Sequence, residues 1–179
     1  MADSNLLLDD FSNADGNATL GTHWQGFTDR VMGGRSDLSA SYVETDRGMA
    51  LRITGSVRLE NNGGFIQVRL PLDATGQYLD ISDYSAVELT VRGQPGAYYV
   101  HLRTQDNRRP WHYYSARLAV GPEWQTVRLP WSKFEAQGER DVLDLSRARS
   151  IAVVAYGERF EADIEVADIA LITSEAAAD

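Results

Sequence analysis

The chain has 179 residues, no cysteine, and 17 basic against 26 acidic side chains, which gives a net charge of −9. This length fits one domain that buries roughly 70% of its unfolded surface without cross-links. The composition excludes disulfides, zinc–thiolate sites and cysteine nucleophiles. The acidic balance argues against nucleic acid as a partner, because that affinity comes mainly from neutralising phosphates.

The N-terminal segment bears on the cellular location of the protein. Asp3 stands where a secretory signal needs positive charge, and Leu6 to Leu8 is the only apolar run there. No stretch approaches the roughly 20 apolar residues of a membrane span. We therefore expect a cytoplasmic protein that does not insert into membranes. Residues 1–173 are expected to form a single domain, followed by a flexible acidic tail over 174–179.

Hydrophobic residues at every second position predict strands along most of the chain. In chain order the alternating segments are 49–59, 66–72, 87–92 and 126–129. Residues 130–134 and 144–149 are expected to form only short helical turns. Half-buried antiparallel strands separated by turn residues are typical of a sandwich, so we predict an all-β, antiparallel jelly-roll β-sandwich.

The last predicted strand changes register. Ile164 and Val166 share one parity, whereas Ile169 and Leu171 share the other. A bulge near residues 167–168 would direct both pairs toward the core.

Residues 29–36 read Asp-Arg-Val-Met-Gly-Gly-Arg-Ser, and a second glycine pair at 63–64 precedes Phe65. Glycine pairs supply backbone freedom at positive φ or a close approach between segments. Gly-rich hairpins often contain them, so each pair alone indicates only a turn. We expect the first pair to belong to a structural clasp, in which Val31 and Met32 pack against the sandwich and one glycine has positive φ. The predicted clasp residues are Asp29, Val31, Met32, Gly33, Gly34 and Ser36.

The order of several short motifs resembles one known family. These motifs are the Met-Gly-Gly loop, Gly-Gly-Phe at 63–65, Leu-Arg-Thr at 102–104 and Trp-Gln-Thr-Val-x-Leu-Pro at 124–130. From about Leu8 to Leu171 the chain is similar to the complex I intermediate-associated protein domain, known from an assembly factor of respiratory NADH:ubiquinone oxidoreductase. The resemblance implies a galactose-binding-like β-sandwich without established catalytic chemistry. Arg30 stands where the family usually has glycine.

Residues 98–118 predict a hairpin of two strands, 98–104 and 111–118. Pairing Leu102 with His112 and Val100 with Tyr114 gathers the apolar side chains on one face. The opposite face then combines aromatic rings with hydrogen-bonding groups, the mixture that stacks on sugars or anchors a peptide. The alternative is that these aromatics only cap the sheet. The predicted ligand- or partner-binding residues are Tyr99, His101, Arg103, Trp111, Tyr113 and Arg117.

Acidic residues near the two ends suggest one possible cofactor. Galactose-binding-like modules often hold a structural calcium between the first and last strands, through carboxylates and backbone carbonyls. If the protein holds a metal, we expect Asp10 and Asp168 to be ligands; solvated or turn-capping acids are the alternative. His101 and His112 lack an evident third ligand, so packed or polar roles are expected for them. No other cofactor is expected.

Enzyme motifs such as Gly-x-Ser-x-Gly or a Walker loop do not occur in the sequence, so we assign no catalytic residue and do not expect an enzyme. The family resemblance implies a non-catalytic protein-interaction or chaperone-like module that assists assembly of a larger complex. The fold implies an alternative, a carbohydrate- or small-ligand-binding module that uses the concave face of the sandwich. The expected partner is therefore a protein client or a glycan. Trp124 and Phe65 are expected to pack in the core or on the sheets.

Overall fold

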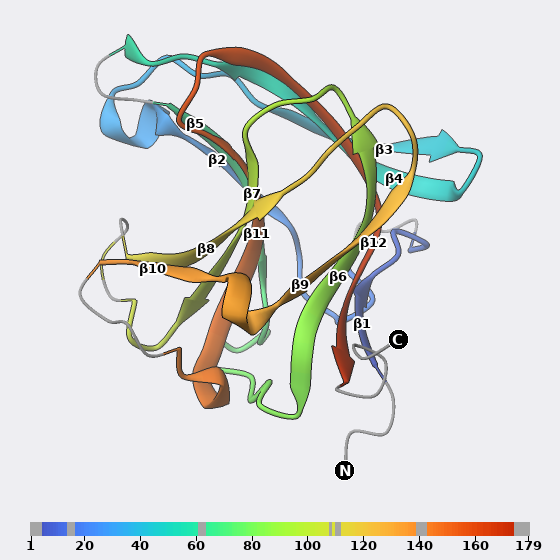
Figure 1. Cartoon of the computed structure of the whole chain (residues 1–179), viewed down its shortest axis with the longest axis vertical. Coiled ribbons are helices and arrows are strands. Elements are labelled where there is room, and N and C mark those ends of the chain that lie inside the picture. Colours follow the sequence, from blue (N-terminus) through green and yellow to red (C-terminus); the bar gives the residue numbers. More distant parts are fainter. Residues whose placement is uncertain are drawn as a thin grey trace.

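The alternating segments fold into two antiparallel sheets that face each other, as predicted (Figure 1). The computed structural model describes residues 5–13, 17–60, 64–107, 109, 112–138 and 143–173, without the side chains of Val31 and Met32. The predicted tail at 174–179 lies outside these residues. No helix in the described part of the chain is long and apolar enough to cross a membrane.

The sheet that we call sheet A contains both ends of the described chain. Its strands follow the order β3-β4-β12-β6-β9, and β1 also pairs with β12. The strands are β1 (Leu6–Asp9), β3 (Ser39–Thr45), β4 (Gly48–Val57), β6 (Tyr84–Gly93), β9 (Gln125–Pro130) and β12 (Phe160–Thr173).

The second sheet, sheet B, follows the order β10-β8-β7-β11-β5-β2. Its strands are β2 (Gln25–Thr28), β5 (Phe65–Pro71), β7 (Tyr98–Thr104), β8 (Tyr113–Leu118), β10 (Glu135–Gln137) and β11 (Ala148–Tyr156). Three short 3₁₀ turns lie wholly within the described residues: η1 (Asp29–Met32), η3 (Trp131–Lys133) and η4 (Leu145–Arg147). The two helical turns predicted near 130–134 and 144–149 are thus confirmed.

The register change in the last strand is confirmed. The pairing of β12 with β6 shifts between Val166 and Asp168, and Ile164 and Ile169 on either side of the shift are both buried. The shift also separates two partners on the other edge of β12, because β4 pairs with residues 160–166 and β1 with residues 169–171. The bulge therefore lets one long strand serve two neighbours while both of its halves face the core.

The core follows the predicted parity, and of the two expected places for Trp124 and Phe65, the core or the sheets, the structure excludes the core. Alternate residues of β5 such as Ile66 and Leu70 are fully buried between the sheets. Trp124 and Phe65 are only half-buried and do not join this core. The Trp124 indole packs 4.4 Å from the Arg92 guanidinium and donates to Asp46. Phe65 has the parity of Gln67, which places it on the side of sheet B away from the core.

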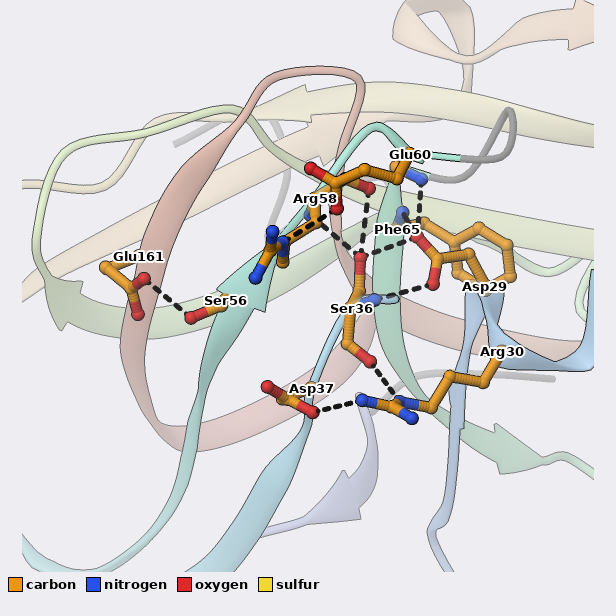
Figure 2. Close-up of polar contacts among 10 residues, drawn as sticks. Asp29, Arg30, Ser36, Asp37, Ser56, Arg58, Glu60, Phe65 and Glu161 are labelled. Carbon is orange, nitrogen blue, oxygen red and sulfur yellow. Dashed lines mark hydrogen bonds and ion pairs between the residues drawn. The ribbon is translucent and has the colours of Figure 1, made fainter. Parts of the chain in front are cut away.

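One buried carboxylate, that of Asp29, holds the Met-Gly-Gly loop in place (Figure 2). It accepts hydrogen bonds from the Ser36 backbone N–H at 2.9 Å, the Ser36 hydroxyl at 2.5 Å and the Gly64 backbone N–H at 2.5 Å. The Ser36 hydroxyl in turn accepts from the Arg58 backbone N–H at 2.9 Å. This carboxylate therefore joins the loop after η1 to the segments at the end of β4 and the start of β5.

The glycine pair shapes the backbone around this carboxylate. Gly33 ends η1 with φ of 88°, which confirms the predicted positive φ. Gly34 has a different role, because a Cβ atom there would lie 2.4 Å from Cγ of Asp29. The expected packing of the Val31 and Met32 side chains lies outside the described residues.

The steric role of Gly34 predicts a specific stability loss. Gly34→Ala is expected to lower the free energy of unfolding by more than the roughly 1 kcal/mol of an ordinary glycine effect, because the methyl group displaces Asp29. Urea denaturation measures this loss. Gly121→Ala is the matched control, since Gly121 has no atom within 4 Å of its Cβ position. Equal loss in the two variants would contradict the clasp.

The charge of Asp29 predicts a pH dependence. Burial raises the pKa of this carboxyl, but hydrogen bonds from Ser36, Gly64 and Phe65 outweigh burial and lower the pKa below its ordinary value of 3.8. The charged form therefore stabilises the fold above pH 3.8, and this contribution is lost as pH falls through the lower pKa of the folded state.

Asp29→Asn is accordingly expected to cost about 2–3 kcal/mol at pH 7, because it leaves buried donors unsatisfied. The difference from the unsubstituted protein should shrink as pH falls below 3.8. Asp37→Asn is the control, because its exposed ion pair with Arg30 at 2.7 Å should contribute less than about 1 kcal/mol. A difference between Asp29→Asn and the unsubstituted protein that stays constant from pH 7 to pH 3 would argue against this role of the carboxylate.

Candidate functional site

The outer face of sheet B, which points away from the core, carries the predicted hairpin residues. Tyr99 in β7 lies opposite Arg117 in β8, and His101 lies opposite Ser115. The predicted division of side chains between the two faces is therefore correct. The predicted register is wrong by two residues, because Leu102 pairs with Tyr114 and not with His112. A shift of two residues keeps every side chain on its predicted face, since the period of a strand is two.

The hairpin side chains contact one another across this face. His101 and Tyr113 stack with ring centroids 4.0 Å apart and planes 17° apart. The Arg117 guanidinium lies 5.3 Å from the Tyr99 ring centroid, and the Arg103 guanidinium lies 5.7 Å from that of Tyr113. Five of the six predicted residues are thus brought together, whereas Trp111 lies outside the described residues. We call the group the aromatic–arginine face; it consists of Tyr99, His101, Arg103, Tyr113, Arg117 and Tyr156.

The centre of the aromatic–arginine face is buried. His101 is only 5% exposed and Arg103 only 9%. The connection between β7 and β8 contributes to this burial, because Arg103 donates to the backbone carbonyls of Arg109 at 3.3 Å and His112 at 3.2 Å. Arg117, by contrast, is exposed. The rim of the face is therefore exposed, and its centre is mostly covered.

Tyr156 at the end of β11 belongs to this site and was not predicted. Its side chain is 42% exposed, and its ring packs edge-to-face on Tyr99 with centroids 6.1 Å apart. The same ring lies 6.3 Å from that of His101. Parity could have placed Tyr156 outward, but β11 is apolar on both faces, with Ala152 and Val154 outward, so its sequence shows no alternation.

A cavity of about 480 Å³ adjoins the aromatic–arginine face. Tyr99 and Arg117 line both the face and the cavity, and β9 and β10 close its other side. Lys133 of the β9–β10 connection borders it as well. The main polar lining residues are Ser115, Arg117, Arg128, Lys133, Glu135 and Gln137.

The charge of the site comes from its arginines. Burial, with the nearby charges of Arg103 and Arg69, lowers the pKa of His101 to about 3. Burial and the charge of Arg69 lower the pKa of Arg103 to about 10. At neutral pH His101 is therefore uncharged and Arg103 is charged. Burial also raises the pKa of Tyr113, which keeps its hydroxyl protonated.

The structure leaves the calcium hypothesis without further support. The first and last strands do pair, through β1 and β12, as that hypothesis required. The Asp10 carboxylate accepts from the Ser12 backbone N–H at 3.1 Å and the Thr19 hydroxyl at 3.3 Å. Within the described ranges, no group of three or more His, Asp or Glu side chains is placed to share a metal. Calcium ligation by Asp10 and Asp168 stays a prediction.

The buried environment of His101 predicts that its imidazole does not titrate near neutrality. Its Cε1–H resonance should keep the same chemical shift from pH 8 to pH 5, because desolvation and two arginines oppose the charged form. An NMR pH titration tests this, with His101→Gln to assign the resonance. A midpoint near the ordinary value of 6.5 would place His101 in contact with solvent.

Comparison of the whole fold finds carbohydrate-binding modules from Clostridium thermocellum. The family 11 module of the cellulosomal cellulase Lic26A-Cel5E has a TM-score of 0.75 and 16% identity, with 97% of each chain covered. The family 11 module in complex with a β-1,3-1,4-mixed-linked tetrasaccharide has a TM-score of 0.71 and 16% identity, with 94% of this chain and 95% of that chain covered. The family 30 module of Cel9D-Cel44B has a TM-score of 0.68 and 14% identity, with 96% and 99% covered.

At these identities the likeness shows the fold alone, which is the predicted galactose-binding-like sandwich. No curated protein sequence matches the chain. The sequence motifs give the more specific result. The model of the family Complex I intermediate-associated protein 30 (CIA30) matches residues 10–161, most of the chain, and the protein therefore belongs to this family.

Proposed function

We propose that this protein is a non-catalytic interaction module that assists the assembly of a larger complex. Its membership of the Complex I intermediate-associated protein 30 family is the observation that carries this proposal. An intermediate of complex I is accordingly the first client to test. The cytoplasmic location stays a prediction.

The aromatic–arginine face is the proposed client-binding surface. Tyrosine and arginine are enriched among residues that dominate binding energy, especially where they are held rigidly. Here the stack of Tyr113 on buried His101 fixes the centre, and Tyr156 extends from it into solvent. A client that packs on Tyr156 and the adjoining cavity would find a preorganised surface, which lowers the entropy cost of binding.

The geometry gives no support to a hydrolytic function at this face. His101 and Ser115 lie opposite each other on β7 and β8, which is the one arrangement that resembles a base beside a nucleophile. A catalytic histidine is oriented by an acceptor such as a carboxylate. Apart from burial, the groups that lower the pKa of His101 among the described residues are instead two cations, Arg103 and Arg69. The stack on Tyr113 and the low pKa of His101 fit a packing role.

The test uses a strain that lacks this protein and expresses either the unsubstituted chain or a variant. Tyr156→Ala is expected to reduce the amount of assembled complex I on a native gel and to abolish cross-linking to its intermediate, while the melting temperature changes little because the side chain is at the rim. Met49→Ala is the matched control, since Met49 is 38% exposed on sheet A. Normal assembly of complex I in the strain that lacks the protein would refute the proposed client. A normal amount of assembled complex I in the strain that expresses Tyr156→Ala would refute the proposed surface.

A carbohydrate-binding role is the second candidate. The fold is shared with a module whose structure contains a β-1,3-1,4-mixed-linked tetrasaccharide, and half-buried tyrosine rings such as Tyr99 can stack on sugars. Affinity electrophoresis in mixed-linked β-glucan tests this alternative. Retardation of the unsubstituted protein that is lost in Tyr156→Ala would favour the sugar over the protein client.

A further inference from the structure

One arginine on the outer face of sheet B has a buried donor without a partner among the described residues. Arg69 in β5 has no ion-pair partner among the described residues, and its Nε atom is buried without a hydrogen-bond acceptor there. A buried donor without a partner is costly and uncommon in folded proteins. Five other arginines pair with carboxylates: Arg30 with Asp37, Arg52 with Asp163, Arg58 with Glu60, Arg92 with Glu165, and Arg128 with Glu88.

The sheet register brings Arg69 toward the aromatic–arginine face. Arg69 lies opposite Ala152 in β11, and Ala152 lies opposite His101 in β7. Arg103 is two residues beyond His101 and lies opposite Ser150. Since neighbouring strands are about 4.8 Å apart, the two arginines flank β11 at a separation that their long side chains can span. Only the small side chains of Ala152 and Ser150 lie between them.

Aromatic rings support both guanidinium groups. The Arg69 guanidinium lies 4.8 Å from the Phe27 ring centroid, and that of Arg103 lies 5.7 Å from the Tyr113 centroid. A guanidinium that contacts a ring can still donate from its N–H edge to an oxygen anion. Burial disfavours the charge on both arginines. The charge of Arg69 also helps to lower the pKa of Arg103 to about 10, and the charge of Arg149 helps to lower the pKa of Arg69. An anion placed between them would relieve both effects.

We propose that Arg69 and Arg103 form a subsite that binds a carboxylate group, carried by an aspartate or glutamate side chain of the protein client. The inference rests on the proposed function, because it assigns ligand chemistry to the same face. A planar guanidinium matches a carboxylate with two parallel hydrogen bonds. The net charge of −9 opposes a long polyanion such as an acidic polysaccharide, whereas an isolated carboxylate meets mainly the local cations.

The first experiment follows the Nε–Hε NMR resonance of Arg69 in the full chain during titration with acetate. A saturable shift with acetate, and none with the neutral isostere acetamide, is the expected result. Arg69→Gln should weaken acetate binding, followed through backbone amides of β11, about tenfold, since one charge-assisted contact is lost. Arg52→Gln is the matched control, because Arg52 is paired with Asp163 on sheet A. Equal responses to acetate and acetamide would overturn the proposal.

A second measurement separates binding from packing. Arg69→Gln should leave the melting temperature unchanged or raise it, because the variant removes a desolvated charge. A lower melting temperature with unchanged acetate binding would show that Arg69 only packs on Phe27, and would overturn the subsite.

The source of the carboxylate is tested by competition for the acetate shift. A short peptide that contains two glutamates among apolar residues is expected to compete at lower concentration than trigalacturonate; the reverse order would overturn the protein source. The acetate-binding experiments can fail or succeed independently of the assembly test. Loss of the acetate response alone refutes the subsite, whereas a full acetate response with normal assembly in Tyr156→Ala refutes the client surface.

Discussion

The Asp29 carboxylate is the interaction on which the arrangement of sheet B most depends. A charged group that is fully buried must have its oxygens satisfied by hydrogen bonds, and here the donors come from two separate segments of the chain. The Ser36 donors belong to the loop after η1, and the Gly64 donor lies directly before β5. Because β5 pairs with β2 on one side and β11 on the other, fixing its first residue also fixes the strands that carry the outer face.

The middle of β11 in sheet B is buried on both sides, and this distinguishes it from a strand of a simple sandwich sheet with one wet face. Its inner face contributes Ile151 and Val153 of β11 to the core, yet Ala152 and Val154 on the outer face are equally buried. The cover consists of long side chains from the flanking strands, including the His101–Tyr113 stack. Such a layer has few alternative arrangements, so it can present Tyr156 and the nearby arginines to a partner in one fixed geometry.

The same sandwich occurs in carbohydrate-binding modules and in this family, so the fold does not select between a sugar and a protein as the ligand. We propose that the side chains on the outer face make that distinction. A desolvated arginine without a carboxylate partner, as Arg69 is among the described residues, is unfavourable in an isolated protein. Its position beside a second arginine therefore favours a ligand that brings negative charge, and a neutral glycan would leave this cost in place.

The sequence by itself determined the fold class, the β12 bulge and the separation of the β7–β8 hairpin into two faces, because all three follow from a period of two. It also determined the family, through short motifs in a fixed order. Only the tertiary structure decided the pairing of Leu102 with Tyr114, since faces are unchanged by a shift of two residues. Only tertiary contacts could add Tyr156 and Arg69 to the site, because β11 pairs with β7, and β5 with β11, across large separations in sequence.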